Sequence, residues 1–77
     1  KVNTKVFTTP AAAGGMSARE RAYFVMGNLC AAYHNGHNRG AAYVSGNTVM
    51  LGDQPIMTCV AGDEPASTLA ARLNQIK

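Results

Sequence analysis

The residues of this chain best suited to chemistry lie close together between positions 34 and 39. His34 and His37 are three residues apart, a spacing at which two imidazoles can approach one metal ion, and Arg39 beside them can orient an anion. A structural or catalytic zinc ion takes three or four protein ligands. Tertiary folding would have to supply the others, from Cys30, Asp53 or Asp63. A metal-binding domain is therefore one interpretation, and a polar loop that ends a helix is the other.

The two cysteines, Cys30 and Cys59, are the second chemical feature. A core built from 77 residues is marginal, and a disulfide closing a loop of about 29 residues would stabilise it by roughly 3.5 kcal/mol. We therefore expect a disulfide, with two separate buried thiols as the alternative. Disulfides persist in oxidising compartments, so the bond predicts a periplasmic or extracellular protein. The start at Lys1, without a leader, is what removal of a signal peptide would leave, and it is also what a trimmed chain would show.

Enzymatic chemistry finds little support in the sequence. Serine, histidine and aspartate all occur, but none stands in a nucleophile elbow or another recognisable catalytic context. The glycines between Gly36 and Gly40 are not followed by the Lys-Ser/Thr pair of a phosphate-binding loop. We expect a protein that is not an enzyme, with no catalytic residues and no cofactor.

The charge distribution argues against a nucleic-acid partner. The net charge is +3, but the basic residues are dispersed along the chain rather than gathered in one run. Charged residues make up only 14% of the sequence, and 47% is hydrophobic. No stretch approaches the roughly 20 apolar residues that a membrane-spanning helix needs. We therefore expect no nucleic-acid binding and no transmembrane segment.

A helix from Ala18 to about His34 is the strongest structural prediction. Ser17 and Glu20 form the Ser-x-x-Glu capping box that begins a helix, and Asn35-Gly36 is a typical helix end. The apolar residues expected to face the core are Ala22, Met26, Leu29, Cys30 and Tyr33. Gly27 in the middle costs about 1 kcal/mol relative to alanine, which suggests close backbone packing there.

The segment before this helix is expected to differ from the rest. Residues 1–9 alternate as in a β-strand, and Pro10 with the Ala-Ala-Ala-Gly-Gly run that follows predicts a loop. We therefore predict one domain over residues 1–77, in which residues 1–15 are a strand or arm with a flexible loop. The compact core is expected over residues 16–77.

Three short strands and a second helix complete the predicted fold. Turn residues separate the runs 41–44, 48–51 and 56–60, which predicts an antiparallel meander. The run 48–51 is apolar on both faces, which suggests a central strand covered on both sides or a strand at a subunit interface. Asp63-Glu64-Pro65 then begins a helix. Its apolar side is Leu69, Leu73 and Ile76.

These elements predict a small α+β domain in β-α-β-β-β-α order, with two helices packed on a three- or four-stranded antiparallel sheet and one disulfide. The predicted function is that of an exported protein-binding domain: an inhibitor, an envelope accessory or an assembly subunit. Arg21 and Phe24 lie off the apolar side of the first helix and are expected to be exposed anchors, or else to contact the loop or the N-terminal segment. Strand addition at the edge carrying Val44 is the predicted binding mode, and a homo-oligomer is left open.

Overall fold

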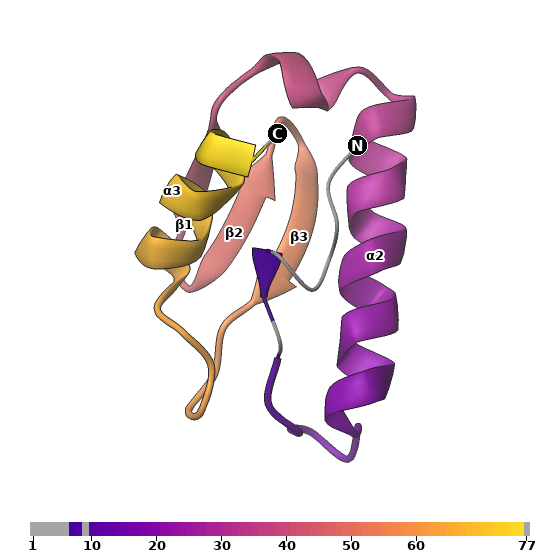
Figure 1. Cartoon of the computed structure of the whole chain (residues 1–77), viewed down its shortest axis with the longest axis vertical. Helices are drawn as coiled ribbons and strands as arrows, with labels where there is room; N and C mark the ends of the chain where they lie inside the picture. The colour runs from indigo at the N-terminus through magenta and orange to yellow at the C-terminus, as the bar shows by residue number, and fades with distance from the viewer. Residues whose placement is uncertain (1–6, 9, 77) are drawn as a thin grey trace.

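The computed structural model describes residues 7, 8 and 10–76, and they form a small α+β domain (Figure 1). Two α-helices pack with one three-stranded antiparallel sheet, which confirms the predicted class. The elements in chain order are α2 (Ala18–His34), the 3₁₀ helix η1 (His37–Arg39), β1 (Ala42–Ser45), β2 (Thr48–Leu51), β3 (Gln54–Thr58) and α3 (Ala66–Ile76).

The sheet is a simple meander in the order β1-β2-β3. Gly46 and Gly52 supply the left-handed backbone of the two hairpin turns, with φ of 62° each. The register between β2 and β3 shifts at Val49/Met50. This shift places two residues of β3 opposite one of β2, which lets the consecutive residues Ile56 and Met57 both be buried.

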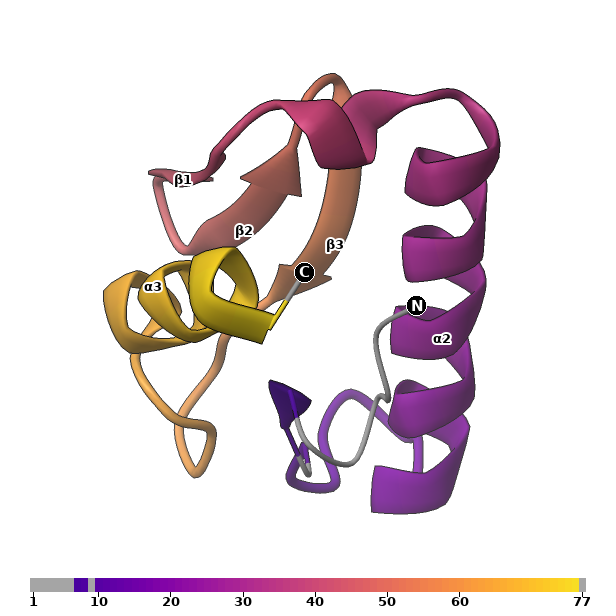
Figure 2. The ribbon, with the colours of Figure 1, turned by 45° about the horizontal axis from the view of Figure 1, so that its top comes forward.

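Both helices cover the same face of the sheet. α3 packs across β1 and β2, and α2 runs along β3 (Figures 1 and 2). On β2, Val49 and Leu51 are fully buried, whereas Thr48 and Met50 on the opposite face are partly exposed. The prediction that β2 is the central strand is confirmed, but among the described residues only one of its faces is covered by helices.

The long helix begins and ends where the sequence predicts. Ser17 and Glu20 form both hydrogen bonds of the capping box, and the helix ends at His34. The side that faces the core was predicted only in part: Leu29 is buried and Tyr33 packs against the core as expected, but other assignments are wrong. Its buried residues are Val25, Leu29 and Ala32. Met26 and Cys30, both assigned to the core, are exposed, because the middle of this helix is apolar on every side and its spacing does not distinguish inner from outer.

The predicted disulfide is wrong. Cys30 and Cys59 are both free thiols. Cys30 is exposed on the side of α2 turned away from the sheet, whereas Cys59 follows β3 and packs against the core. A bridge requires Cα atoms within about 7 Å and converging Cβ bonds, and the sulfur atoms of Cys30 and Cys59 are not at disulfide distance. The prediction of export loses its main support and stays a prediction.

The core reaches further toward the N-terminus than residue 16. Phe7 is fully buried within the core cluster and Thr8 is also buried. The backbone oxygen of Phe7 accepts a hydrogen bond of 2.9 Å from Arg72 of α3. The strand predicted over residues 1–9 lies outside the described residues apart from Phe7 and Thr8, neither of which is in a strand.

The second helix agrees with its prediction. It begins directly after Pro65. Leu69 and Leu73 are fully buried and Ile76 packs against the core at its edge. The apolar side predicted from the spacing is therefore the side that packs on the sheet.

Candidate interaction site

The outer edge of β1 is occupied by an asparagine side chain from α3. Asn74 accepts a hydrogen bond from the Ala42 backbone N–H at 2.7 Å and donates one to the Ala42 carbonyl at 3.1 Å. Alternate residues of an edge strand turn their backbone groups to the same side, so Ala42 and Val44 share this edge. A strand added here, as predicted for Val44, would have to displace Asn74, and Val44 as a binding residue stays a prediction.

The opposite edge of the sheet is covered by polar side chains of α2. Asn28 donates a hydrogen bond to the Ile56 carbonyl at 2.8 Å, and Arg21 donates one to the Thr58 carbonyl at 3.1 Å. Covering an edge in this way is one of the devices by which proteins prevent edge-to-edge pairing. Both edges thus have hydrogen-bonding groups occupied by the helices.

Arg21 is the centre of a buried polar network, not an exposed anchor. Its guanidinium donates two hydrogen bonds to Asp63, at 3.0 and 2.8 Å, and a third to the Ala11 carbonyl at 2.6 Å. The side chain of Arg21 is 12% exposed and that of Asp63 is fully buried. The prediction that Arg21 is exposed is wrong. The alternative, that it contacts the loop before the helix, is confirmed.

The carboxylate of Asp63 is held ionised by this network. Burial by itself raises the pKa of Asp63, but hydrogen bonds from Arg21 and from the backbone N–H groups of Ala11 and Val60, with the charge of Arg21, outweigh it. The net effect lowers the pKa of Asp63 to about 2. The pair therefore joins α2 to the loop after β3 at any ordinary pH.

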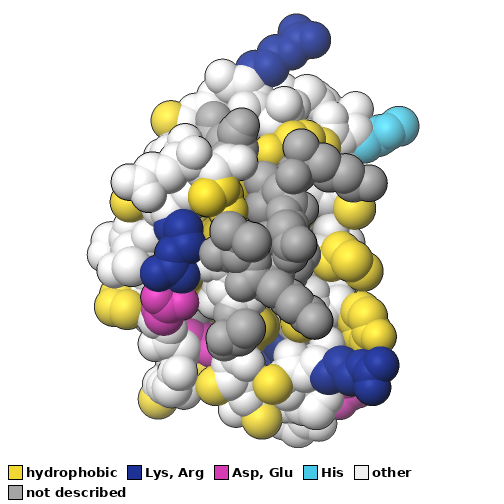
Figure 3. Space-filling view, in the orientation of Figure 1, with side chains coloured by type: hydrophobic (Ala, Val, Ile, Leu, Met, Phe, Trp, Pro, Cys, Tyr) yellow, Lys and Arg dark blue, Asp and Glu magenta, His cyan; other side chains and the backbone are white. Residues whose placement is uncertain are grey.

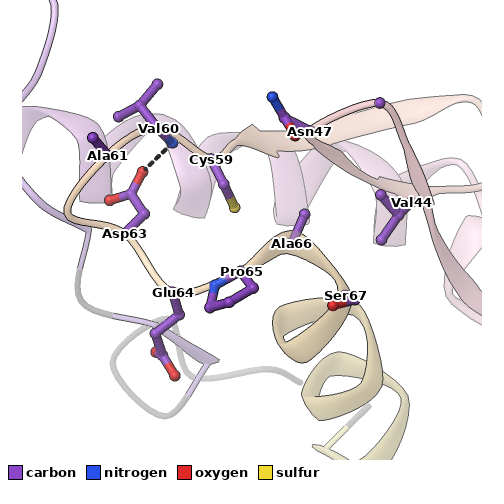
Figure 4. A pocket seen from close by; sticks show the side chains of 11 residues that line it. Val44, Asn47, Cys59, Val60, Ala61, Asp63, Glu64, Pro65, Ala66 and Ser67 are labelled. Carbon is purple, nitrogen blue, oxygen red and sulfur yellow. Dashed lines mark hydrogen bonds between the residues drawn. The ribbon is translucent and has the colours of Figure 1, made fainter.

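A hollow of about 480 Å³ lies between the β1–β2 hairpin, the loop after β3 and the start of α3 (Figure 4). Its lining includes Val44, Cys59 and both carboxylates of the loop, Asp63 and Glu64. Burial and the nearby Asp63 raise the pKa of the Cys59 thiol, so it is a weak nucleophile at neutral pH. Glu64 is paired with Arg72 at 2.6 Å. The described lining of the hollow thus offers packing and hydrogen bonding rather than an activated group.

The histidines of the 34–39 segment are not brought into a metal cluster. His34 is exposed at the end of α2, and Arg39 is exposed in η1. His37 lies against the β2–β3 turn, where a Cβ on Gly52 would come within 2.3 Å of its Nδ1 atom. The described residues contain no group of three or more histidine, cysteine or acidic side chains that could hold a metal ion. The metal-binding interpretation gains no support from this arrangement.

The side of α2 that faces away from the sheet is the most unusual surface of the described structure. Tyr23, Phe24 and Met26 are 54%, 64% and 46% exposed, and the exposure of Phe24 agrees with its prediction. Gly27 and Cys30 are exposed beside them. We call these five residues the outer face of α2.

The outer face of α2 lies within an uncharged stretch of the helix, with ionisable side chains at both ends of that stretch. The sequence from Ala22 to Tyr33 contains no charged residue. At one end the Arg19 guanidinium lies 5.9 Å from the Tyr23 ring centroid, and at the other end stands His34. Figure 3 shows hydrophobic side chains along this side of the molecule, between a histidine above and charged side chains below. Sequence reasoning missed this surface, although the uncharged segment was the signal for it.

No family model, curated protein or solved structure matches this chain. Among the described residues, none of the helices combines the length and hydrophobicity needed to span a membrane.

Proposed function

We propose that this chain is a protein-binding domain whose partner covers the outer face of α2. The observation that carries this proposal is that the helix is apolar on both sides. Val25 and Leu29 face the core, while Tyr23, Phe24 and Met26 face solvent. A helix that is hydrophobic all round is ordinarily buried all round, and contiguous exposed apolar surface typically marks an interaction site.

The composition of the outer face supports a protein partner. Tyr23 and Phe24 are the large aromatic side chains that dominate binding energy in protein interfaces, and Arg19 is stacked near the tyrosine ring at the margin. Charged residues are depleted from the centre of such interfaces, as they are here between Ala22 and Tyr33.

This binding mode replaces strand addition as the favoured one. The edge of β1 is occupied at Ala42 by Asn74, and that of β3 by Asn28 and Arg21. The outer face of α2 requires no such displacement. The more specific role remains a prediction, as an inhibitor, an envelope accessory or an assembly subunit. Export of the domain also remains a prediction.

Cys30 provides a direct test, because its thiol lies within the outer face of α2. The measurement is the rate of maleimide labelling of Cys30 in a Cys59→Ala variant, in extracts of the native cells and in dilute purified protein. We expect labelling at least tenfold slower in the extract. Phe24→Glu should restore fast labelling in the extract with an unchanged circular dichroism spectrum.

A cysteine on α3 serves as the matched control. Gln75 is exposed, so Gln75→Cys in a chain lacking the two native cysteines should be labelled equally fast in both conditions. Equal rates for Cys30 in extract and in dilute solution would rule out a partner on this face.

A further inference from the structure

We infer that the partner is a second copy of this chain, with the two α2 helices packed antiparallel and crossing at Gly27. This inference rests on the proposed function, since it names the occupant of the same face. The resulting dimer has a twofold axis through the crossing point, the commonest symmetry of protein oligomers.

Gly27 is the observation that points to another helix. Glycine in the middle of a helix is less favourable than alanine, and Gly27 lacks the left-handed backbone that would require it. A Cβ added there would meet nothing within 4 Å among the described residues. The described part of the chain thus gives no reason for a glycine at this position. A helix crossing over it does, because small residues let two helix backbones approach closely.

The outer face of α2 is complementary to itself about this point. Residues equally distant from Gly27 meet across the twofold axis of an antiparallel pair. Phe24 then lies opposite the partner's Cys30, and Tyr23 opposite the partner's Ala31, so each large ring meets a small side chain. Such alternation of large and small residues is what allows two faces to pack without gaps.

Charge determines the direction of the pair. In the antiparallel arrangement Glu20 lies opposite the partner's His34, and a carboxylate and an imidazole form a favourable hydrogen bond. The capping box uses one oxygen of Glu20, and a carboxylate can accept several hydrogen bonds. A parallel pair would place Glu20 beside the partner's Glu20 and align the two helix dipoles, both of which are unfavourable.

The expected affinity follows from the size of the surface. A helix of 17 residues is about 25 Å long, so one helix pair is at the small end of specific interfaces. We therefore expect a dissociation constant on the order of micromolar.

The first experiment is sedimentation equilibrium of the purified chain from about 1 µM to 1 mM, which brackets this range. The wild type should change from monomer to dimer, and Phe24→Glu should stay monomeric. Gly27→Ala separates the dimer from the fold. It should weaken dimerisation at least tenfold, while raising the Tm of the dilute monomer by about 4–8 °C through its better helix propensity. A monomeric wild type at all concentrations, or unchanged dimerisation in Gly27→Ala, would overturn the inference.

The second experiment locates the crossing point by disulfide formation. Gly27→Cys, in a chain with Cys30→Ser and Cys59→Ala, should oxidise rapidly to a covalent dimer. With Cys30 as the single cysteine the reaction should be at least tenfold slower, because two Cys30 residues lie about 9 Å apart along the antiparallel axis, beyond disulfide reach. Gln75→Cys as the single cysteine measures random collision. Faster cross-linking through Cys30 than through Gly27→Cys would exclude the antiparallel pair.

Failure of this inference can be told apart from failure of the proposed function. If the purified chain stays monomeric but Cys30 is protected in native extracts, another protein covers the outer face and the homodimer is wrong. If the purified chain stays monomeric and Cys30 is labelled equally fast in extracts and in dilute solution, both proposals are wrong.

Discussion

The two helices of this domain face the same sheet but differ in how they meet solvent. α3 is amphipathic, with Leu69 and Leu73 inside and polar residues outside. α2 buries Val25 and Leu29 and exposes Tyr23 and Phe24. Because α2 is apolar on both sides, its sequence does not show which side packs on the sheet. The fold buries only one of these sides and leaves the other exposed.

The helices also differ in how they are tied to the loop after β3. Arg21 of α2 pairs with Asp63, and Arg72 of α3 pairs with the next residue, Glu64. The first pair is buried, whereas Arg72 and Glu64 are 33% and 43% exposed. Since buried pairs are sensitive to loss of one partner and exposed pairs contribute little, α2 should depend on its pair far more than α3 does.

Arg21→Ala should have the largest effect of the substitutions considered. Removing the arginine leaves the buried Asp63 charge without its partner, which typically lowers the free energy of unfolding by about 3–5 kcal/mol. Arg19→Ala is the matched control on the exposed side of the same helix, and we expect a change within about 0.5 kcal/mol. Urea denaturation of both variants measures the difference. Equal losses would contradict the buried role of Arg21.

Truncation of the inner residues should affect both helices alike. Leu29→Ala in α2 and Leu73→Ala in α3 should each lower the free energy of unfolding by about 2–5 kcal/mol, because both side chains are buried in the core. Met26→Ala, on the outer face of α2, should change it by less than about 1 kcal/mol in dilute protein. A larger effect of Met26→Ala than of Leu29→Ala would reverse the assignment of the two sides.

Acid should weaken the ion pair between Arg21 and Asp63 that joins α2 to the loop after β3. The pKa of Asp63 is lowered to about 2 in the folded protein, against about 3.9 in an unfolded chain. The resulting stabilisation, about 2–3 kcal/mol, is present above pH 4 and is lost as the pH falls toward 2. Unfolding measured between pH 2 and 6 should show this loss. In Asp63→Asn the loss should largely disappear, whereas Glu64→Gln should leave it nearly intact.

Asn74→Ala should have a smaller effect on stability than Arg21→Ala or the core truncations, and a distinct effect on association. It removes two hydrogen bonds to Ala42 and lowers the free energy of unfolding by about 1–2 kcal/mol. It also frees the edge of β1, so aggregation should increase in light-scattering measurements at high concentration. Gln75 is the next residue along the helix and is exposed. Gln75→Ala should therefore change neither the stability nor the aggregation.

The parts of the fold predicted correctly are those with strong local signals. The capping box determined the start of α2, and glycine-containing turns determined the meander. The inner side of α2 was predicted only in part because Ala22, Met26 and Cys30 repeat at the same spacing as the residues that are buried. The disulfide was a conclusion from composition, and composition does not show which way Cys30 points.

The interaction site was predictable only in part. Phe24 was identified by its position off the apolar side, and it is exposed as expected. Arg21 was assigned to the same surface because charged residues usually face solvent. Its partner Asp63 is far along the chain, and local sequence carries no signal for such a contact.

The pairing of Arg21 with Asp63 also bears on how the chain folds. The contact joins residues 42 positions apart, and Asp63 holds Ala11 across 52 positions. Closing such distances carries an entropic cost that local hairpins do not have, so the meander should form before this junction. A mutation at Arg21 should then accelerate unfolding while leaving the refolding rate nearly unchanged.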